Sequence, residues 1–298
     1  VDMNGQKYIY AARGTRGDNW DYGTRDFYRY GPLTGTSADL SLTWEKMLDC
    51  PYNGSSSRDG MRGYMAYPGY DEDPTAVTRT YMYLAVGDYS SQLYKYGPVE
   101  EDLPGASDLD GLDGVGGRWE KLSNAPSYFR WHGHYGPSLS YPGTGSYLYG
   151  FTGDTDDVGF SFRIVRYDID TGCWQDTLKS LPFDQGYSDT TGAGGYIYAV
   201  NHYGHNNFWR YDPATDTWNE PVVDTHSNRM GNAVVDQNDN IYLFYGAFDT
   251  DLPSHVWVYT PATADGTGRW TGLIKVPFQM GSGVKAEFNS SDNAIYVL

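Results

Sequence analysis

The densest group of side chains that could carry out chemistry lies in the segment 128–135, which reads Tyr-Phe-Arg-Trp-His-Gly-His-Tyr. His132 and His134 form a His-x-His pair, which can hold a metal ion from one face of a strand because neutral imidazole is a common ligand. A second possibility is that a Tyr/His pair beside Arg130 removes the proton next to a uronic carboxylate while the guanidinium neutralises the developing charge. The residues for this polysaccharide lyase chemistry would be His132, His134, Tyr135, His202 and Arg130.

Arginine, histidine and tyrosine residues also recur ahead of successive aromatic strands. The predicted ligand-binding set is Arg62, Arg130, His132, Tyr187 and Arg229. A guanidinium fork matches a carboxylate and aromatic rings stack on sugar faces, so this set favours a carboxylated or hydroxyl-rich glycan. The alternative is that the arginine and histidine residues at these places belong to the repeat itself.

An acidic run offers a possible metal site. Asp108, Asp110 and Asp113 alternate with glycine and leucine, and such carboxylates could wrap Ca²⁺ with hard oxygen ligands. The run lacks the closing glutamate of an EF-hand loop, so a solvated acidic turn is the alternative. A similar group, Asp236 to Asp239, is better explained as a turn between strands. The sequence therefore establishes no cofactor, and calcium is the candidate that this run offers.

Other catalytic signatures do not stand out. The sequence shows no Ser-His-Asp order, phosphate-binding loop, Cys-x-x-Cys pair or paired-carboxylate motif. Cys50 and Cys173 fall in different repeats, and they are compatible with a disulfide in an oxidising compartment or with two free, buried thiols. These features favour a non-enzymatic protein, with a carbohydrate-active enzyme as the alternative.

The composition predicts strands joined by tight turns. The 298 residues include 29 Tyr and 37 Gly, whereas the strong helix formers are sparse. The formal net charge is −17, which repels phosphate backbones and anionic lipid and so argues against nucleic acid and membranes as partners. No stretch has the apolar length needed to span a bilayer.

A repeat with a fixed order of aromatic residues runs through the chain. Each copy begins with an aromatic strand, of which Tyr8-Ile9-Tyr10 is the first and Ile295-Tyr296 the last. Most of these strands run into a small residue, as at Gly14, Gly87, Gly150 and Gly246. The next strand ends in a Tyr followed by a Gly, Asp or Pro turn, and a Trp follows: Trp44, Trp119, Trp174, Trp218 and Trp270. The spacing is typical of four-stranded blades with variable loops.

This pattern resembles the kelch family, whose repeat has the Gly-ended strand, the Tyr-Asp turn and the Trp. The double glycine of that family is weakened here, so the resemblance is to a divergent repeat. It implies an all-β, kelch-like β-propeller with five full repeats plus a partial sixth from the terminal strands. We expect a single domain over 1–298, with repeats at roughly 1–62, 63–130, 131–185, 186–229, 230–279 and a partial repeat at 280–298. Galactose-oxidase-like enzymes share this fold, but their copper site needs a Cys next to a Tyr and a longer chain.

The terminal repeat does not close simply. Two strands are expected after the fifth full repeat, and a surplus strand can pair with a neighbouring chain. The sequence therefore favours a non-enzymatic propeller module, extracellular or at the cell surface, that acts in recognition or assembly. Its predicted partners are a glycan or copies of itself, which could form a homo-polymer. The alternative is a polysaccharide lyase or another carbohydrate-active propeller enzyme.

Overall fold

The computed structural model describes strands and short turns distributed along the whole chain. The described residues are 2–3, 6–12, 26–33, 44–51, 64–66, 81–86, 90–97, 118–126, 138–151, 163–176, 178–179, 188–201, 208–219, 232–245, 255–261, 268–272, 286–289 and 293–297. They form strands β1 to β22 and contain no helix. Every described pairing joins two strands that follow one another in the chain, and every one of these pairings is antiparallel.

Sheets 1 to 3 follow one another in chain order, and each has four strands. Sheet 1 contains β1 (Asp2–Met3), β2 (Gln6–Ala12), β3 (Phe27–Leu33) and β4 (Trp44–Lys46). Sheet 2 contains β5 (Tyr64–Ala66), β6 (Met82–Ala85), β7 (Leu93–Gly97) and β8 (Arg118–Lys121). Sheet 3 contains β9 (Leu139–Ser140), β10 (Tyr147–Phe151), β11 (Ile164–Asp168) and β12 (Cys173–Gln175).

Sheets 4 and 5 repeat this arrangement, and sheet 6 is shorter. Sheet 4 contains β13 (Ser188–Ala193), β14 (Tyr196–Asn201), β15 (Phe208–Asp212) and β16 (Thr217–Asn219). Sheet 5 contains β17 (Asn232–Val235), β18 (Ile241–Tyr245), β19 (His255–Thr260) and β20 (Arg269–Gly272). Sheet 6 contains only two described strands, β21 (Ala286–Asn289) and β22 (Ala294–Val297).

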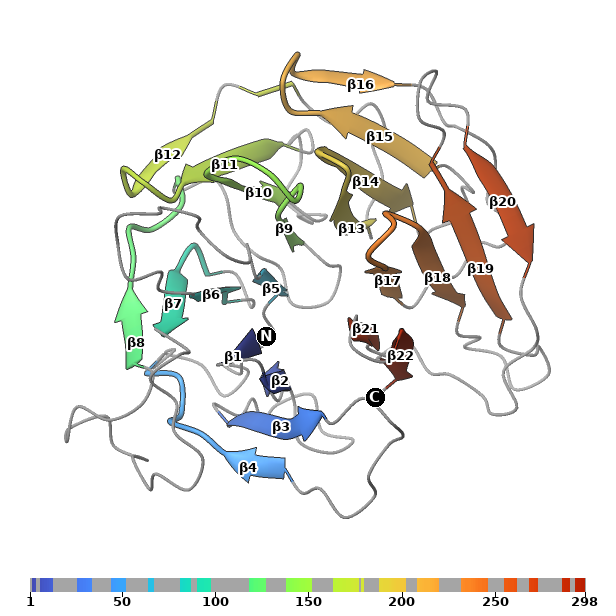
Figure 1. The fold of residues 1–298 in the computed structure, drawn as a ribbon. Helices are drawn as coiled ribbons and strands as arrows, with labels where there is room; N and C mark the ends of the chain where they lie inside the picture. The colour runs from blue at the N-terminus through green and yellow to red at the C-terminus, as the bar shows by residue number, and fades with distance from the viewer. Residues whose placement is uncertain are drawn as a thin grey trace, which may run out of the picture.

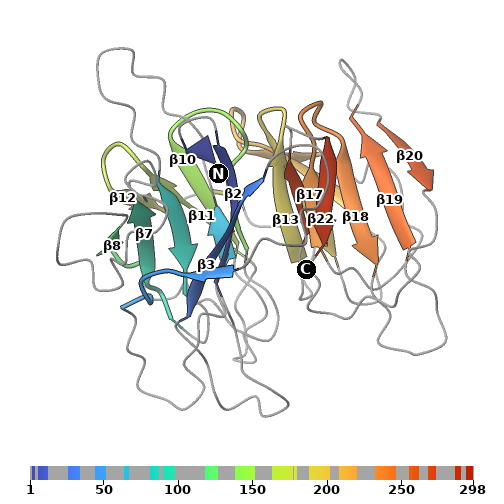
Figure 2. The ribbon, with the colours of Figure 1, turned by 60° about the horizontal axis from the view of Figure 1, so that its bottom comes forward.

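The sheets stand around a central axis, with the first strand of each sheet on the inside (Figure 1). Sheet 6 lies in the part of the ring between sheet 5 and sheet 1, and the tilted view shows β22 beside β17 and β18 (Figure 2). The all-β propeller with five full repeats and a partial sixth is therefore confirmed. The described strands of sheet 1 all come from N-terminal residues and those of sheet 6 from C-terminal residues, so neither sheet borrows one of these strands across the closure.

Two features of the sequence can be checked directly against the fold. Among the described residues there is no helix long and apolar enough to cross a membrane. Cys50 is buried, Cys173 is exposed, and both thiols are free. A disulfide between the two cysteines is therefore absent, and only one of them is buried.

The hairpin turns after the third strands are encoded locally, as the Tyr-Asp pattern predicts. The Asp168 carboxylate accepts hydrogen bonds from the backbone amides of Asp170 and Thr171, at 3.0 and 3.2 Å. Asp212 accepts one from the amide of Ala214 at 2.9 Å. Such bonds hold the backbone in a turn without help from the rest of the protein. Asp236 likewise accepts a bond from the Asn238 amide at 2.8 Å, so this group is a turn, as expected.

Aligned residues form an aromatic row across each four-stranded sheet, which we call the Tyr–Trp row. It takes an aliphatic residue or Met from the second strand, a Tyr from the third and a Trp from the fourth. The five rows are Ile9–Tyr30–Trp44, Met82–Tyr96–Trp119, Leu148–Tyr167–Trp174, Ile197–Tyr211–Trp218 and Ile241–Tyr259–Trp270. The repeat seen in the sequence is thus one side-chain row repeated in register.

A second row occupies the opposite face, because neighbouring residues of a strand point to opposite sides of a sheet. We call it the cation row, since its third-strand residue is Arg or Lys in sheets 1 to 4. The rows are Tyr10–Arg29–Glu45, Tyr83–Lys95–Glu120, Tyr149–Arg166–Gln175 and Tyr198–Arg210–Asn219. In sheet 5 the corresponding row is Tyr242–Val258–Thr271, which has no cation.

Neighbouring sheets meet through tyrosine pairs, one from each kind of row. The ring centroids lie 6.2 Å apart for Tyr10 and Tyr96, and 6.4 Å apart for Tyr83 and Tyr167. The next two interfaces have the same contact at 5.8 Å each, between Tyr149 and Tyr211 and between Tyr198 and Tyr259. Each Tyr–Trp row therefore packs on the cation row of the preceding sheet, with tilted ring geometries that aromatic pairs favour.

These buried phenols predict a sensitivity to alkali. Burial is the leading cause that raises the pKa of Tyr198 to about 12, and it also raises the pKa of Tyr83 and Tyr211. A folded-state pKa above the unfolded value of about 10 means that the stabilisation is complete below pH 10 and is lost as pH rises toward 12. We expect tyrosinate absorbance at 295 nm to rise in two phases, the second coinciding with loss of near-ultraviolet circular dichroism. Full ionisation near pH 10 with an unchanged dichroism spectrum would contradict this expectation.

Candidate functional site

The residues predicted from the sequence to carry chemistry lie outside the described residues. This holds for Arg130, His132, His134, Tyr135 and His202, for Arg62, Tyr187 and Arg229, and for Asp108, Asp110 and Asp113. Their roles in catalysis, glycan binding and calcium binding stay predictions. In the described ranges, no group of three or more His, Cys, Asp or Glu residues could hold a metal ion. A candidate site must therefore be built from the sheets themselves.

The third-strand cations of the cation rows serve packing between sheets. Arg29 is 2% exposed, its guanidinium lies 4.9 Å from the ring centroid of Tyr8, and it forms an ion pair with Glu45 at 2.5 Å. Burial alone would lower the pKa of Arg29, but its hydrogen bonds with Glu45 and Tyr10 outweigh burial and raise the pKa. The guanidinium is thus held charged inside an interface between sheets.

The same arrangement recurs in sheets 2 to 4. Lys95 lies 4.8 Å from the ring centroid of Tyr81 and 2.9 Å from a carboxylate oxygen of Glu120. Arg166 and Arg210 lie over Tyr147 and Tyr196, at 4.4 and 4.5 Å. In each of sheets 1 to 4 the cation lies over a second Tyr on the second strand or directly before it. This second Tyr precedes the Tyr of the cation row by two residues. Sheet 5 has Asn240 at that position and Val258 in place of the cation.

The interface between sheets 5 and 6 is apolar instead. Val234, Phe244, Val256 and Ala286 form a buried cluster, and the sheet 6 residues Phe288, Ile295 and Val297 pack against it. Sheet 6 is therefore anchored to the ring by hydrophobic contact with the inner part of sheet 5. Burying this surface offsets the low intrinsic stability of a two-stranded sheet.

Sheet 6 ends where the other sheets continue. β21 pairs with β22 from Ala286↔Val297 to Asn289↔Ala294, and β22 is the outer strand of this sheet. The third and fourth strands that would follow it have no counterpart among the described residues. In sheets 1 to 5 these two strands carry the Tyr and the Trp of the Tyr–Trp row, so the described part of sheet 6 lacks that half of the pattern.

The consequence is visible on sheet 1, at Trp44. The Trp residues of sheets 2, 4 and 5 pack on the preceding sheet: Trp119 lies 5.1 Å from Phe27, Trp218 lies 6.3 Å from Phe151 and Trp270 lies 5.0 Å from Phe208, between ring centroids. The sheet that precedes sheet 1 in the ring is sheet 6. Trp44 is 40% exposed, the one large hydrophobic side chain classed as exposed in the described part of the chain.

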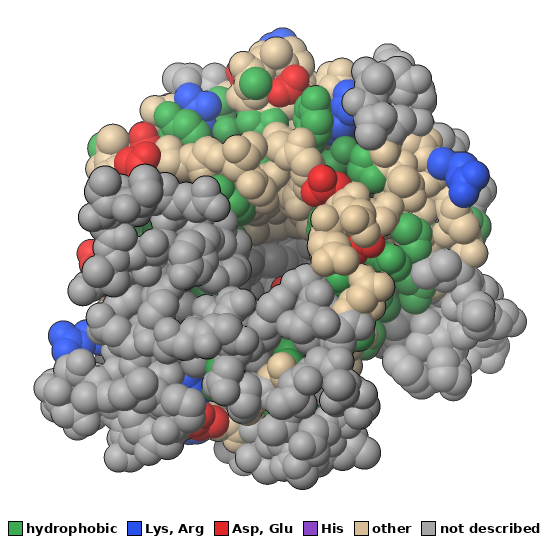
Figure 3. Space-filling view, viewed as in Figure 1, with side chains coloured by type: hydrophobic (Ala, Val, Ile, Leu, Met, Phe, Trp, Pro, Cys, Tyr) green, Lys and Arg blue, Asp and Glu red, His purple; other side chains and the backbone are tan. Residues whose placement is uncertain are grey.

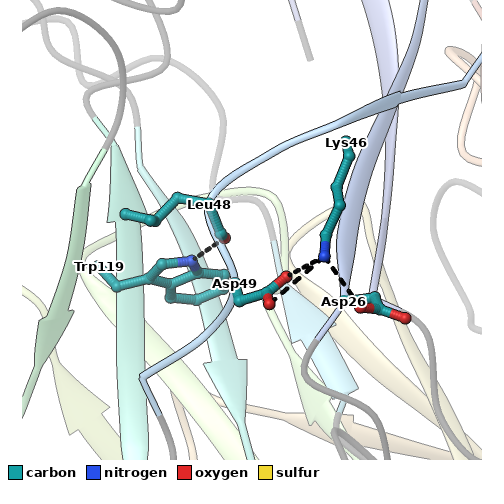
Figure 4. Close-up of polar contacts among 5 residues, drawn as sticks. All are labelled: Asp26, Lys46, Leu48, Asp49 and Trp119. Carbon is teal, nitrogen blue, oxygen red and sulfur yellow. Dashed lines mark hydrogen bonds and ion pairs between the residues drawn. The ribbon is translucent and has the colours of Figure 1, made fainter. Parts of the chain in front are cut away.

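Hydrogen bonds of the indoles involve the connecting segments. Trp119 donates its Nε1 proton to the carbonyl of Leu48 at 2.9 Å, in the segment that follows sheet 1 (Figure 4). That segment is fixed by Lys46, whose ammonium lies 3.2 Å from Asp49 and 3.3 Å from Asp26 (Figure 4). Trp174 likewise donates to the carbonyl of Ser123, in the segment that follows sheet 2. These two indoles are therefore hydrogen-bonded to the segment that follows the previous sheet in the chain.

We define the sixth-sheet seat as the place beside β22, between sheets 5 and 1, that a third and a fourth strand would occupy. Its sheet 1 side presents Tyr30 and Trp44, whose ring centroids lie 5.2 Å apart. Its sheet 5 side presents Val258 and Thr271, of which Val258 is only 9% exposed. Of these four residues, Trp44 and Thr271 are the exposed ones. In the sequence Trp44 is one repeat Trp among five; what sets it apart in the structure is that the sheet preceding it in the ring has two described strands.

The inner strand of sheet 6 carries one carboxylate, and the described residues give no catalytic set around it. Figure 3 shows a hollow at the centre of this face, and β21 lies on the inner side of sheet 6. The side chain of Glu287 on β21 is exposed, yet burial of its surroundings raises its pKa. One carboxylate is not a catalytic set, so the sixth-sheet seat remains the better candidate site.

Comparisons with known proteins agree with the fold. No protein-family model matches the sequence, and no curated protein matches it. Among solved structures, a protein called YjhT is 15% identical with a TM-score of 0.54, and the match covers 82% of this chain and 72% of YjhT. A protein named "putative 6-phosphogluconolactonase" from Bacteroides uniformis is 9% identical with a TM-score of 0.54, covering 98% and 88% of the two chains. A protein of the same name from Bacteroides fragilis is 9% identical with a TM-score of 0.50, covering 100% and 89%. At these identities the likeness shows a shared propeller fold, and the kelch family remains a resemblance.

Proposed function

We propose that this chain is a non-enzymatic, extracellular propeller module that acts in recognition or assembly by taking up strands of another polypeptide at the sixth-sheet seat. The observation that carries the proposal is that sheet 6 has two described strands where each other sheet has four, with Trp44 exposed beside it. Strand addition to a sheet supplies backbone hydrogen bonds for affinity and alternate side-chain pockets for specificity.

The energetics favour occupation of the seat. An exposed Trp is a large apolar surface, and burying such a side chain stabilises a complex by roughly 1.5–3 kcal/mol or more. Tyrosines of the other sheets pack against one another inside the ring: a tyrosine pair lies at four of the five interfaces between sheets that are consecutive in the chain. The repeat pattern of four strands per sheet therefore predicts two further strands at the sixth-sheet seat.

The first test uses a strand pair with the repeat pattern as probe. A synthetic peptide of residues 255–272, which covers β19 and β20, should bind the intact protein in isothermal titration calorimetry. Trp44→Ser should weaken binding by about tenfold or more, because the loss of a buried aromatic contact is worth at least about 1.4 kcal/mol. Lys121→Ser, an exposed change at the end of β8, is the matched control and should bind as the wild type does.

Two outcomes would overturn the proposal. One is that the peptide does not bind; the other is that it binds equally to wild type and Trp44→Ser. Both variants alter exposed side chains, so their thermal unfolding should match the wild type closely. If the wild type forms oligomers in sedimentation velocity and the peptide dissociates them, the strands are supplied by copies of this chain, which is the assembly form of the same proposal.

A further inference from the structure

We infer that Arg210 on β15 belongs to a binding site for a carboxylate anion, at the interface between sheets 4 and 5. This site is separate from the sixth-sheet seat and goes beyond the proposed function. The inference follows from a comparison of the four cation rows. The other three cations each bond to the fourth-strand residue opposite them, whereas the Nε of Arg210 has no acceptor.

In sheets 1 to 3 the fourth strand supplies the acceptor for the cation. Arg29 donates from Nε and from a terminal nitrogen to one carboxylate oxygen of Glu45, at 3.2 and 2.5 Å. Sheet 2 has an ion pair at the same place. Arg166 donates from Nε to the side-chain oxygen of Gln175 at 2.7 Å. The acceptor in these three sheets is therefore a Glu or a Gln.

Sheet 4 has Asn219 at this place, opposite Arg210. The side chain of Asn is one methylene group shorter than that of Gln or Glu. The Nε of Arg210 is shielded from solvent and has no hydrogen-bond partner. The guanidinium is nevertheless held in position, because it lies 4.5 Å from the ring centroid of Tyr196 and forms a hydrogen bond with Tyr198. A buried donor without an acceptor is costly, and such a group commonly marks the place of an ion or a water molecule.

The next sheet does not supply a carboxylate to Arg210 as it does to Arg166. Burial is the leading cause that raises the pKa of Tyr149; a hydrogen bond from Arg166 lowers this pKa, and the nearby carboxylate of Asp216 raises it. Asp216 stands two residues before the Trp of sheet 4, and Gly268 has this position in sheet 5. Arg210 is therefore the one cation of the described rows that has neither kind of partner, and its charge favours an anion.

A carboxylate matches what Arg210 lacks. The Nε and a terminal nitrogen of a guanidinium form a fork that fits a carboxylate, and Glu45 occupies this fork on Arg29. The amide nitrogen of Asn219 can donate a further hydrogen bond to the same anion. Asn219 lies on the outer strand β16, and both Asn219 and Arg210 are only partly buried. An anion therefore reaches the guanidinium from the rim of the ring (Figure 1).

The carboxylate has two possible sources, a free organic acid and a uronic acid of a glycan, and three probes separate them. Sodium acetate carries only the shared group, sodium glucuronate adds a sugar ring, and glucose has the ring without the carboxylate. Equal affinities for acetate and glucuronate would assign the site to free acids. An affinity for glucuronate at least about tenfold higher would assign it to a glycan, because the sugar ring would then contribute about 1.4 kcal/mol. Glucose should not bind in either case.

The test is thermal unfolding of the intact protein, followed by circular dichroism at constant ionic strength. Sodium chloride is replaced stepwise by sodium acetate or sodium glucuronate. A ligand at ten times its Kd should raise the unfolding midpoint by about 2 °C. Asn219→Glu places a carboxylate beside Arg210, as Glu45 lies beside Arg29. This variant should raise the midpoint without ligand and should abolish the response to both anions.

The matched control is Gln175→Glu, which changes the net charge by the same amount in sheet 3 and should leave the response intact. Arg210→Gln should abolish the response; if this variant fails to fold, Asn219→Glu and Gln175→Glu still decide the matter. Two results would overturn the inference. One is an unchanged midpoint when carboxylate replaces chloride, and the other is a response that survives in Asn219→Glu. Binding of a peptide at the sixth-sheet seat has no bearing on either result.

Discussion

Replacing Phe208 with alanine should lower the free energy of unfolding by about 3–5 kcal/mol, which is the usual cost of removing a buried Phe side chain. Phe208 is fully buried on β15, and its ring centroid lies 5.4 Å from Tyr198, 4.9 Å from Tyr259 and 5.0 Å from Trp270. It therefore joins sheet 4 to both aromatic residues of the Tyr–Trp row in sheet 5. The cavity left by alanine would lie inside an interface between two sheets, where the surrounding rings cannot easily close it.

The measurement is urea-induced unfolding followed by far-ultraviolet circular dichroism, with two comparison variants. Phe208→Leu keeps much of the volume and should cost less than Phe208→Ala. Trp44→Ala removes a larger aromatic side chain from the exposed position in sheet 1 and should cost about 1 kcal/mol or less. Similar losses for Phe208→Ala and Trp44→Ala would show that Trp44 is packed as the other Trp residues are, and would contradict the sixth-sheet seat.

Much of the fold could be predicted from the sequence because the repeat is specified by residues that lie close together in the chain. Tyr167-Asp168 and Tyr211-Asp212 specify turns through bonds from the Asp side chain to nearby amides, and a Trp seven residues after each Tyr fixes the start of the hairpin partner. These signals need no knowledge of tertiary structure. They also predict five full repeats and a partial sixth, as the sheets show.

The cation rows could not be read from the sequence with the same certainty. Arg29 contacts Tyr8 and Glu45, which lie 21 and 16 positions away, and the intervals differ between repeats because the loops differ in length. Only the strand registers show that these residues form one row. The interpretation of arginine and histidine as ligand-binding groups concerned other positions, and those positions lie outside the described residues.

The candidate site was hidden for a related reason. Trp44 has the same place in the repeat as Trp119 and Trp270, so no local signal distinguishes it. Its exposure depends on the sheet that precedes it in the ring, and that sheet is formed by residues some 240 positions further along the chain. Exposure at this position is a property of ring closure, which becomes visible only when the first and last sheets are placed side by side.

The second large effect is expected at Gly192 on β13, where alanine should cost about 3 kcal/mol or more. A Cβ there would lie 1.6 Å from the carbonyl oxygen of Tyr141 and 2.7 Å from the Cα of Pro142, so the backbones of sheets 3 and 4 would have to move apart. Gly143→Ala is the control: its φ is +92°, which disfavours alanine, but a Cβ there meets nothing within 4 Å, so a cost of about 1–2 kcal/mol is expected. Chemical denaturation of both variants measures the difference. A smaller loss for Gly192→Ala than for Gly143→Ala would mean that backbone conformation, and not the close approach of the two sheets, is what requires glycine in this region.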